Sequence, residues 1–194
     1  LVLLTVPDDV LPELVQGLAA TSAVSPGSFV VHAAGRYGIE VLATLTRMGC
    51  LPLALHPVMT FTGTSVDLNR LSGCPFGVTA PEILRPVAEA LVVEMGGEPI
   101  WVPENQRALY HAALAFGANN LMTLVNETKS LLTTAGIDNP ERLITPLFNA
   151  ALDNVLRDGD TAVTGPIVRG DVETVRRHLV TLCPGVQGVS PIDS

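Results

Sequence analysis

The chain has 194 residues, of which 47% are hydrophobic, so it can bury a sizeable core in one large domain or two small ones. Acidic residues outnumber basic ones by 19 to 11, and without a basic stripe we expect no nucleic-acid binding through phosphate contacts. No apolar run free of strongly polar residues is long enough to span a bilayer, so we expect no membrane segment.

The first hundred residues alternate between expected strands and helices. Leu1–Val6 is a continuous apolar run, the pattern of a buried parallel strand, and Asp8 is the expected N-cap of the helix that follows. Further strands are expected at Ser28–His32, Leu51–Leu55, Phe76–Thr79 and Pro99–Val102, with helices at Ile39–Met48 and Pro81–Met95 between them. This alternation predicts βαβ units and a parallel sheet. Because a chain rarely begins in the middle of a sheet, we expect its N-terminal part to be missing.

From Glu104 onward only helices are expected. The longest, Leu109–Thr133, contains no proline and one glycine, and as a helix of about 25 residues it would be about 37 Å long. It is apolar almost all round, which is the pattern of a buried helix, so its polar residues need hydrogen-bond partners. Two more helices are expected, one opening at Asn139–Pro140–Glu141 and one at Asp171–Leu182.

The carboxyl ends of the first three expected strands carry small and polar residues. In open parallel sheets, ligands bind at this edge. The residues there are Val6, Pro7, Asp8, His32, Ala33, Ala34, Gly35 and His56. His56 is expected either to act as a general acid or to order the next loop through backbone contacts. His32 has the same alternatives, and its small neighbours favour a wall that faces a cofactor.

The long helix carries a second candidate set. His111, Ala115 and Asn119 are spaced by four and share one helical face, with Tyr110 and Asn120 on either side. These side chains are expected to form a polar notch for a substrate, with Asn119 orienting a substrate oxyanion or holding a catalytic group. The alternative is that they bridge packed helices or a dimer interface.

The loop Thr164–Asp171 ends at an Asp N-cap. The helix N-terminus and Arg169 together favour an anion such as a substrate carboxylate, with Thr164 and Gly165 beside it. The alternative is an Arg169–Asp171 pair that only fixes the loop.

The three cysteines are Cys50, Cys74 and Cys183, and none belongs to a CxxC pair. Their odd number and wide spacing argue against a disulfide framework and against a zinc site. We therefore expect no metal, and cysteine usage of this kind fits a reducing cytoplasm.

Five stretches in the same order resemble a known family. They are TVPDD, VVHAAGRYG, HPVMTF, LYHAALAFGANNLMTLV and TGPIVRGD. Together, from Val2 to about Leu182, they resemble a bacterial family of Rossmann-like oxidoreductases with a C-terminal domain of unknown function. More distantly the layout is similar to pyrroline-carboxylate reductase, ketopantoate reductase and the hydroxyacid dehydrogenases related to 6-phosphogluconate dehydrogenase.

The resemblance implies an α/β fold, an N-terminally truncated Rossmann-type parallel sheet followed by an all-helical domain. Residues 1–103 would be the C-terminal part of a dinucleotide-binding domain, and residues 104–194 a helical domain for substrate binding and dimerisation. About 60 residues with the glycine-rich turn would lie upstream. On this pattern Val6–Asp8 and His32–Gly35 would flank NADP or NAD, and His56 would face the nicotinamide.

One departure keeps two functions open. The related hydroxyacid dehydrogenases place a lysine on the long helix, where this chain has His111, and Lys129 lies about five turns further on. The first hypothesis is an NAD(P)-dependent reductase of a small carbonyl or imine acid, with His56 or His111 as proton donor. The second is a dinucleotide- or metabolite-binding dimer without turnover. In both, we expect a homodimer formed through the helical domain.

Overall fold

The computed structural model describes residues 1–182, and Cys183 therefore lies outside the described residues. The chain divides into two compact units, the first from Leu1 to Leu121 and the second from Met122 onward. The dividing point lies inside the longest helix. The domain limits expected from the sequence, 1–103 and 104–194, mark a different feature, the end of strand-and-helix alternation, and stay a prediction.

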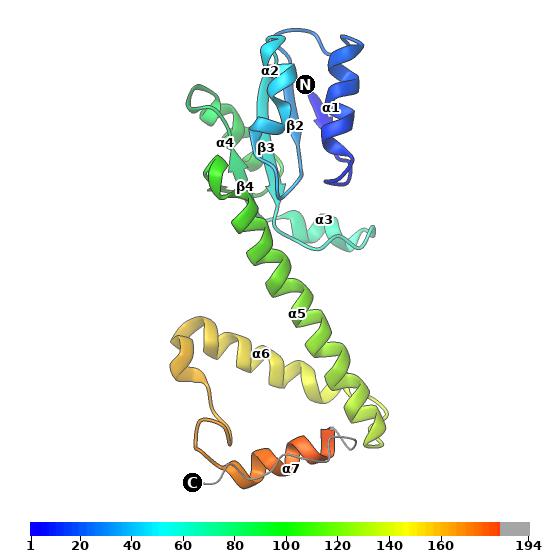
Figure 1. Ribbon diagram of the computed structural model, residues 1–194, viewed down its shortest axis with the longest axis vertical. Coiled ribbons are helices and arrows are strands. Elements are labelled where there is room, and N and C mark those ends of the chain that lie inside the picture. The colour runs from blue at the N-terminus through cyan, green and yellow to red at the C-terminus, as the bar shows by residue number, and fades with distance from the viewer. Residues whose placement is uncertain (183–194) are drawn as a thin grey trace. The chain divides into compact units, whose positions relative to one another are not determined.

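A five-stranded sheet with the strand order β1-β2-β3-β4-β5 forms the centre of the first unit (Figure 1). The strands are β1 (Val2–Leu4), β2 (Phe29–His32), β3 (Leu51–Pro57), β4 (Pro75–Thr79) and β5 (Glu98–Trp101). All five strands expected from the sequence are thus confirmed, with ends shifted by one or two residues. The pairs β1–β2 and β2–β3 are parallel, as expected.

The direction of β4 differs from the sequence prediction. β4 pairs antiparallel with β3, with Ala54 opposite Thr79 and Pro57 opposite Phe76, and β5 then runs parallel to β4. The connection between β3 and β4 contains only the short helix α3 (Val66–Leu71) and returns at the same edge of the sheet. A parallel pairing would have needed a crossover to the opposite edge. The fold is therefore α/β with a mostly parallel sheet.

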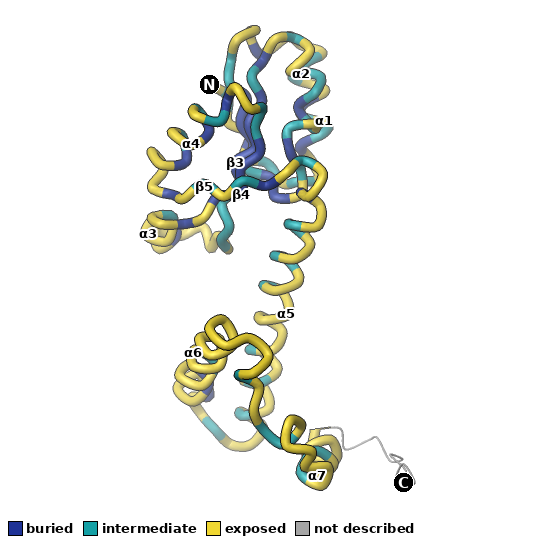
Figure 2. The backbone as a smooth tube through the Cα atoms, turned by 90° about the vertical axis from the view of Figure 1, so that its left-hand side faces the viewer, coloured by how far each residue is buried: buried dark blue, intermediate teal, exposed yellow. Residues whose placement is uncertain are grey.

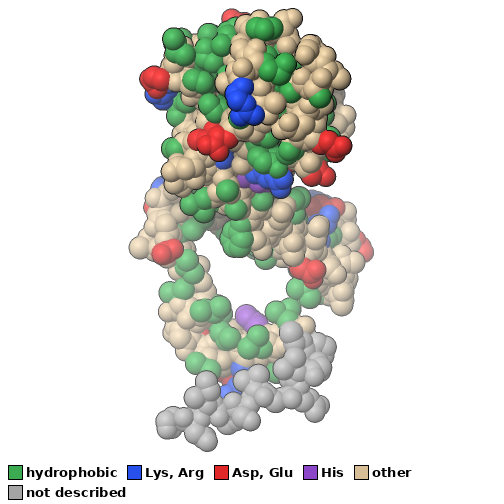
Figure 3. All heavy atoms as spheres, turned by 45° about the horizontal axis from the view of Figure 1, so that its top comes forward, with side chains coloured by type: hydrophobic (Ala, Val, Ile, Leu, Met, Phe, Trp, Pro, Cys, Tyr) green, Lys and Arg blue, Asp and Glu red, His purple; other side chains and the backbone are tan. Residues whose placement is uncertain are grey.

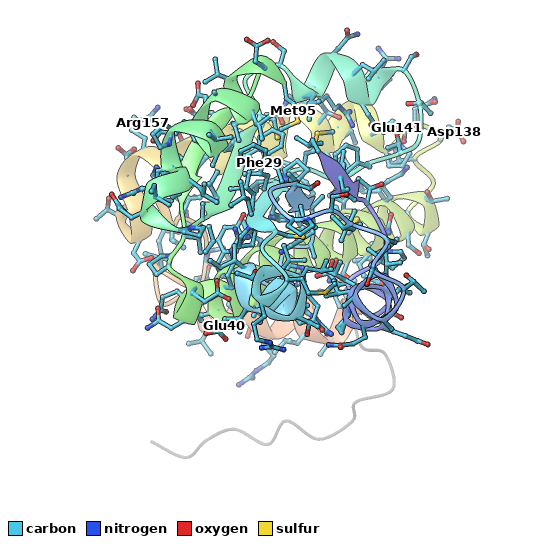
Figure 4. All side chains as sticks on the ribbon, turned by 90° about the horizontal axis from the view of Figure 1, so that it is seen from above. Phe29, Glu40, Met95, Asp138, Glu141 and Arg157 are labelled. Atoms are coloured by element: carbon cyan, nitrogen blue, oxygen red, sulfur yellow. The ribbon has the colours of Figure 1, made fainter. Side chains whose placement is uncertain are left out.

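Helices cover both faces of this sheet. The helical segments of the first unit are α1 (Leu11–Ala20), η1 (Ile39–Leu42), α2 (Ala43–Arg47), α3, η2 (Glu82–Leu84), α4 (Arg85–Glu94), η3 (Glu104–Gln106) and the first half of α5 (Arg107–Thr134). Seen from above in Figure 4, α1 and α2 lie on one side of the sheet, and the labelled Phe29 of β2 packs with the cluster on the α4 side. The second unit contains the rest of α5, α6 (Glu141–Asp158), η4 (Gly159–Ala162) and α7 (Val172–Leu182).

The core consists of two clusters, because neighbouring strand residues point to opposite faces. Val30 joins Leu11, Leu42 and other residues under α1 and α2, whereas the next residue, Val31, joins Leu53 and others under α4. Each of these side chains is less than one tenth exposed. Burying one such side chain contributes about 1.5–3 kcal/mol, so the sheet and its two helical layers hold the first unit together.

Three helix caps were expected, at Asp8, Asn139 and Asp171, and two are wrong. Helix α6 has Pro140 at its N-cap, with no side-chain hydrogen bond. Helix α1 has Val10 at the N-cap with no side-chain hydrogen bond, whereas Asp8 lies in the preceding turn and accepts a hydrogen bond from the backbone N–H of Arg36 at 3.3 Å. The cap of α7 is confirmed, since Asp171 accepts from the N–H of Thr174 at 3.1 Å. No described ion pair involves Arg169.

The expected burial of the long helix is also wrong in the single chain. Helix α5 is continuous as predicted, but Arg107 is its one buried residue, and Leu109 and Phe116 are 68% and 72% exposed. Among the described residues of the second unit, only Pro140 and Ile144 are buried. Figure 2 shows α6 and α7 almost wholly exposed, and Figure 3 shows hydrophobic side chains on the surface of this unit. The apolar residues of α5 lie all round the helix instead of on one face. They leave apolar surface that the described residues of a single chain do not cover.

No helix within residues 1–182 is both long enough and apolar enough to cross a membrane.

Candidate functional site

A cleft of about 470 Å³ lies at the carboxyl ends of β1, β2 and β3, entirely within the first unit. It is lined by Thr5, Val6, Asp8, Ala33, Gly35, His56, Pro57, Met59, Phe61 and His111. The lining therefore comes from three strand ends, from the connection after β3 and from the first turns of α5. This is the edge where the sequence predicted a ligand site.

The structure brings many of the predicted site residues together. Those that line the cleft are Val6, Asp8, Ala33, Gly35, His56 and His111. Pro7, His32 and Ala34 do not line it, and Tyr110 lies against His56. Four lining residues were not predicted as site residues, although they lie in two of the stretches that carry the family resemblance, TVPDD and HPVMTF: Thr5, Pro57, Met59 and Phe61. The roles of all these residues stay predictions.

His56 connects the cleft to the start of α5. Its Nδ1 lies 2.8 Å from the hydroxyl oxygen of Tyr110, and the two rings meet edge to face with centroids 5.6 Å apart. Burial, helped by the charge of Arg107 and by His111, lowers the pKa of His56 to about 4. The imidazole is therefore neutral near pH 7 and carries one N–H that it can donate.

Gly35 allows two imidazoles to share one wall of the cleft. A Cβ atom on Gly35 would lie 2.5 Å from Cδ2 of His111 and 2.8 Å from Nε2 of His56. The centroids of the two imidazole rings are 6.1 Å apart, and the ring planes are inclined by 78°. Only glycine leaves room for both rings, so the strand end predicted to face a cofactor is also the place where β2, β3 and α5 meet.

His32 is a buried residue behind the cleft. Its Nε2–H donates to the carbonyl of Gly38 at 2.8 Å, and its Nδ1 accepts from the N–H of Ala34 at 3.2 Å. Burial lowers the pKa of His32 to about 4. Both ring nitrogens are thus used in shaping the loop from Ala33 to Gly38. This geometry matches the predicted alternative in which the histidine orders a loop.

Arg107 does not line the cleft but acts on His56 through its charge, and it is a further residue that the sequence analysis missed. It is 2% exposed, and its guanidinium donates to Oγ1 of Thr79 at 2.8 Å and to the carbonyls of Gly77 at 2.9 Å, Ala54 at 3.1 Å and Gly35 at 3.5 Å. Burial lowers the pKa of Arg107, but from so high a value that the side chain stays charged. No carboxylate forms an ion pair with it within the described residues. The spacing 107, 110, 111 was a usable signal, since it places Arg107 on the helical face of Tyr110 and His111.

Two of the other predicted substrate contacts do not line the cleft. Asn119 and Asn120 are exposed on α5, and the amide of Asn120 donates to the carbonyl of Phe116 in its own helix at 2.8 Å. Thr164, Gly165 and Arg169 belong to the second unit, and their role stays a prediction.

A larger hollow of about 520 Å³ lies elsewhere on the first unit, beside Arg36, Tyr37 and Glu104. None of the predicted site residues lines it. Among the described residues, no three His, Cys, Asp or Glu side chains are grouped so that they could hold a metal ion.

Comparisons with known proteins agree with this architecture. Residues 1–57 match a family described as a Rossmann-like domain. Residues 74–189 match the family described as domain of unknown function DUF2520, and since this is more than half of the sequence, the chain belongs to that family. The resemblance inferred from the five sequence stretches is thereby confirmed. The comparison with curated proteins found no match.

Several solved structures share the fold. A protein from Thermotoga maritima aligns with a TM-score of 0.72 and 22% identity, over 95% of this chain and 70% of its own. A provisionally assigned NADP oxidoreductase from Bacteroides fragilis aligns with a TM-score of 0.75 and 22% identity, over 94% of this chain and 68% of its own. A 1-pyrroline-5-carboxylate reductase from Streptococcus pyogenes aligns with a TM-score of 0.61 and 13% identity, over 94% of this chain and 71% of its own. At these identities the likeness shows the fold, a Rossmann-like α/β unit followed by helices.

The crowding around Gly35 predicts the effect of one added methyl group. Gly35→Ala should destabilise the protein by about 1–3 kcal/mol in chemical denaturation, because the two imidazoles must move apart. Gly17→Ala in α1 is the matched control, since nothing lies within 4 Å of its added Cβ. That change should be neutral or stabilising by up to about 1 kcal/mol. Equal stability of Gly35→Ala and wild type would show that the rings are not packed as described.

The buried His32 predicts a stability that depends on pH. A histidine in the unfolded chain titrates near 6.5, whereas His32 in the folded chain titrates near 4. Between these values only the unfolded chain takes up the proton, so the free energy of unfolding should fall as the pH drops. His32 alone should account for about 2 kcal/mol between pH 7 and pH 5.

Denaturation of His32→Gln at both pH values tests this. The variant should lose less stability than wild type between pH 7 and pH 5, whatever its stability at pH 7. His178→Gln, a change of an exposed histidine on α7, is the control and should keep the wild-type pH dependence. The same pH dependence in His32→Gln and wild type would contradict the buried neutral imidazole.

Proposed function

We propose that this protein is an NAD(P)-dependent oxidoreductase that reduces a small carbonyl or imine acid. The observation that carries the proposal is the position of His56, a neutral imidazole that lines a cleft at the carboxyl ends of parallel strands and is backed by the buried cation of Arg107. Rossmann-like domains bind dinucleotides at this edge of the sheet.

The residues present fit the nicotinamide end of a dinucleotide. Ala33 and Gly35 keep the strand ends small, and Val6, Met59 and Phe61 give the cleft apolar surface on which a flat ring can lie. Ligand pockets of this kind are largely apolar with a few polar groups. These residues fit the nicotinamide ring of NADP and of NAD equally well. When bound, the cofactor would supply a hydride.

The chain's own residues would supply the proton and the electrostatic setting. Hydride addition leaves negative charge on the substrate heteroatom, and the N–H of His56 can donate to that atom. The charge of Arg107 lies behind His56 and favours negative charge in the cleft. His111, which also lines the cleft, is the alternative donor.

One observation favours a second candidate, a dinucleotide- or metabolite-binding protein without turnover. Neither lysine nor arginine lines the cleft, so nothing there pairs directly with a substrate carboxylate. A panel of keto and imino acids separates the two, since one good substrate excludes the binding-only function.

The second unit supports assembly with a second copy of the chain. Its described residues bury almost no apolar side chain, whereas Leu143, Leu147 and Leu152 on α6 are 53%, 62% and 50% exposed. A unit this small needs a partner surface to bury its apolar faces. Closed homodimers are the commonest solution, so we propose that these helices pair with those of another copy.

Calorimetric titration of the full-length protein with NADPH and NADH tests the cofactor assignment. We expect micromolar binding of at least one of them, with the reduced ring in the cleft. Absence of binding by both would rule out the proposed cofactor.

Steady-state kinetics with a substrate from the panel tests the proton donor. His56→Gln should lower kcat by about a hundredfold or more, with little change in cofactor affinity, because proton transfer in the transition state is lost. His111→Gln should have a smaller effect. The reverse order would move the donor role to His111, and His178→Gln on α7 should match wild type.

Light scattering tests the assembly. Wild type should be a dimer at micromolar concentration, and Leu147→Glu combined with Leu143→Glu should give a monomer, because two charges replace the apolar face. Leu68→Glu, at a leucine 73% exposed in the first unit, should stay dimeric. A monomeric wild type would contradict the proposal.

A further inference from the structure

The two ring nitrogens of His56 have different neighbours at the candidate site. Nε2 of His56 lies beside Gly35, which lines the cleft, whereas Nδ1 faces the hydroxyl of Tyr110 at 2.8 Å. Tyr110 itself does not line the cleft. His56 therefore stands between the space available to a ligand and a phenol that a ligand in the cleft does not reach directly.

The surroundings give this hydrogen bond a direction. The hydroxyl of Tyr110 makes no other hydrogen bond within the described residues, and burial raises the pKa of its phenol, so the phenol keeps its proton. A neutral imidazole with Nδ1 as acceptor carries its single N–H on Nε2. With Tyr110 as donor to Nδ1, the N–H of His56 is thus on the cleft side.

Gly77 and Arg107 prepare the phenol to carry negative charge. A Cβ on Gly77 would collide with the Tyr110 hydroxyl, so glycine lets the phenol lie close against β4. The carbonyl of Gly77 accepts from Arg107 at 2.9 Å, and the guanidinium carbon lies 5.6 Å from the centre of the Tyr110 ring. A cation buried without a carboxylate partner within the described residues stabilises any anion that forms beside it.

We infer that Tyr110 is the second proton carrier of the site, acting through His56, and that the substrate is consequently a carbonyl rather than an imine. The inference rests on the proposed function. As the substrate oxygen receives negative charge, it takes the proton from Nε2 of His56, and the N–H electron pair stays on Nε2. Nδ1 takes the proton from the Tyr110 hydroxyl in the same process. The result is an alcohol, a neutral imidazole and a phenolate beside Arg107. After the alcohol leaves, Nε2 takes a proton from water in the cleft, which leaves as hydroxide, and Nδ1 returns its proton to the phenolate, so that the starting state is restored.

Relative basicity selects the substrate class. An alkoxide is a much stronger base than a phenolate, so the proton moves downhill from Tyr110 to a reduced carbonyl. An imine nitrogen is a weaker base than a phenolate and would have to be protonated before it accepts hydride. A neutral imidazole backed by a phenol is a poor acid for that step. The pair therefore suits a keto acid or a similar carbonyl compound.

Tyr110→Phe tests the relay, and Tyr37→Phe removes the hydroxyl of the only other tyrosine as a matched control. With a keto acid as substrate, Tyr110→Phe should lower kcat about a hundredfold with little change in KM and should alter the pH profile of kcat, whereas Tyr37→Phe should match wild type. The groups that face His56 and shape that profile are Asp8, His32, Arg107, Tyr110 and His111. An unchanged kcat and pH profile in Tyr110→Phe would overturn the relay and leave the proposed reductase standing.

A second measurement does not depend on turnover. In the full-length protein labelled with ¹⁵N-histidine, the His56 signals, assigned by their loss in His56→Gln, should show the neutral form with the proton on Nε2 at pH 7. In Tyr110→Phe a substantial share should move to the form with the proton on Nδ1. A wild-type proton on Nδ1 would overturn the relay even where no cofactor binds. Faster turnover of cyclic imino acids than of keto acids would overturn the substrate class.

Discussion

The first unit depends on one buried guanidinium. Arg107 donates to the carbonyls of Gly35, Ala54 and Gly77, and so holds together the loop after β2, the middle of β3 and the middle of β4 at the place where α5 begins. Each buried carbonyl left without a donor costs about 1–3 kcal/mol. The same side chain sets the electrostatics of the cleft, because its charge is matched by carbonyl dipoles instead of a carboxylate. The guanidinium of Arg107 thus both stabilises the fold and sets the charge beside the cleft.

Local patterns in the sequence were sufficient for most of the fold and for the location of the cleft. The strand predicted at Leu51–Leu55 and the helix predicted at Leu109–Thr133 are present, because apolar runs, proline and glycine act over a few residues. The gathering of His56 and Gly35 also followed from a general rule, that carboxyl ends of neighbouring parallel strands meet at one edge.

Features that depend on distant contacts were not predictable in the same way. The direction of β4 depends on where the chain after Pro57 returns, and no local pattern encodes it. Arg107 lies two residues before the predicted helix Leu109–Thr133, so its alignment with Tyr110 was overlooked. The exposure of Phe116 shows a further limit, since apolar composition indicates that a surface must be covered but does not indicate by what.

The reversal between β3 and β4 separates two kinds of residue around the cleft. His56 and Tyr110 belong to a regular strand and a regular helix, β3 and α5, whereas Met59 and Phe61 belong to the connection that leaves β3 and returns as β4 at the same edge. Connections of this kind tolerate substitution and changes of length far better than strands and helices do. The rim of the cleft can therefore diverge between relatives and adapt to ligands of different size, while His56 and Tyr110, the proposed proton carriers, stay where they are.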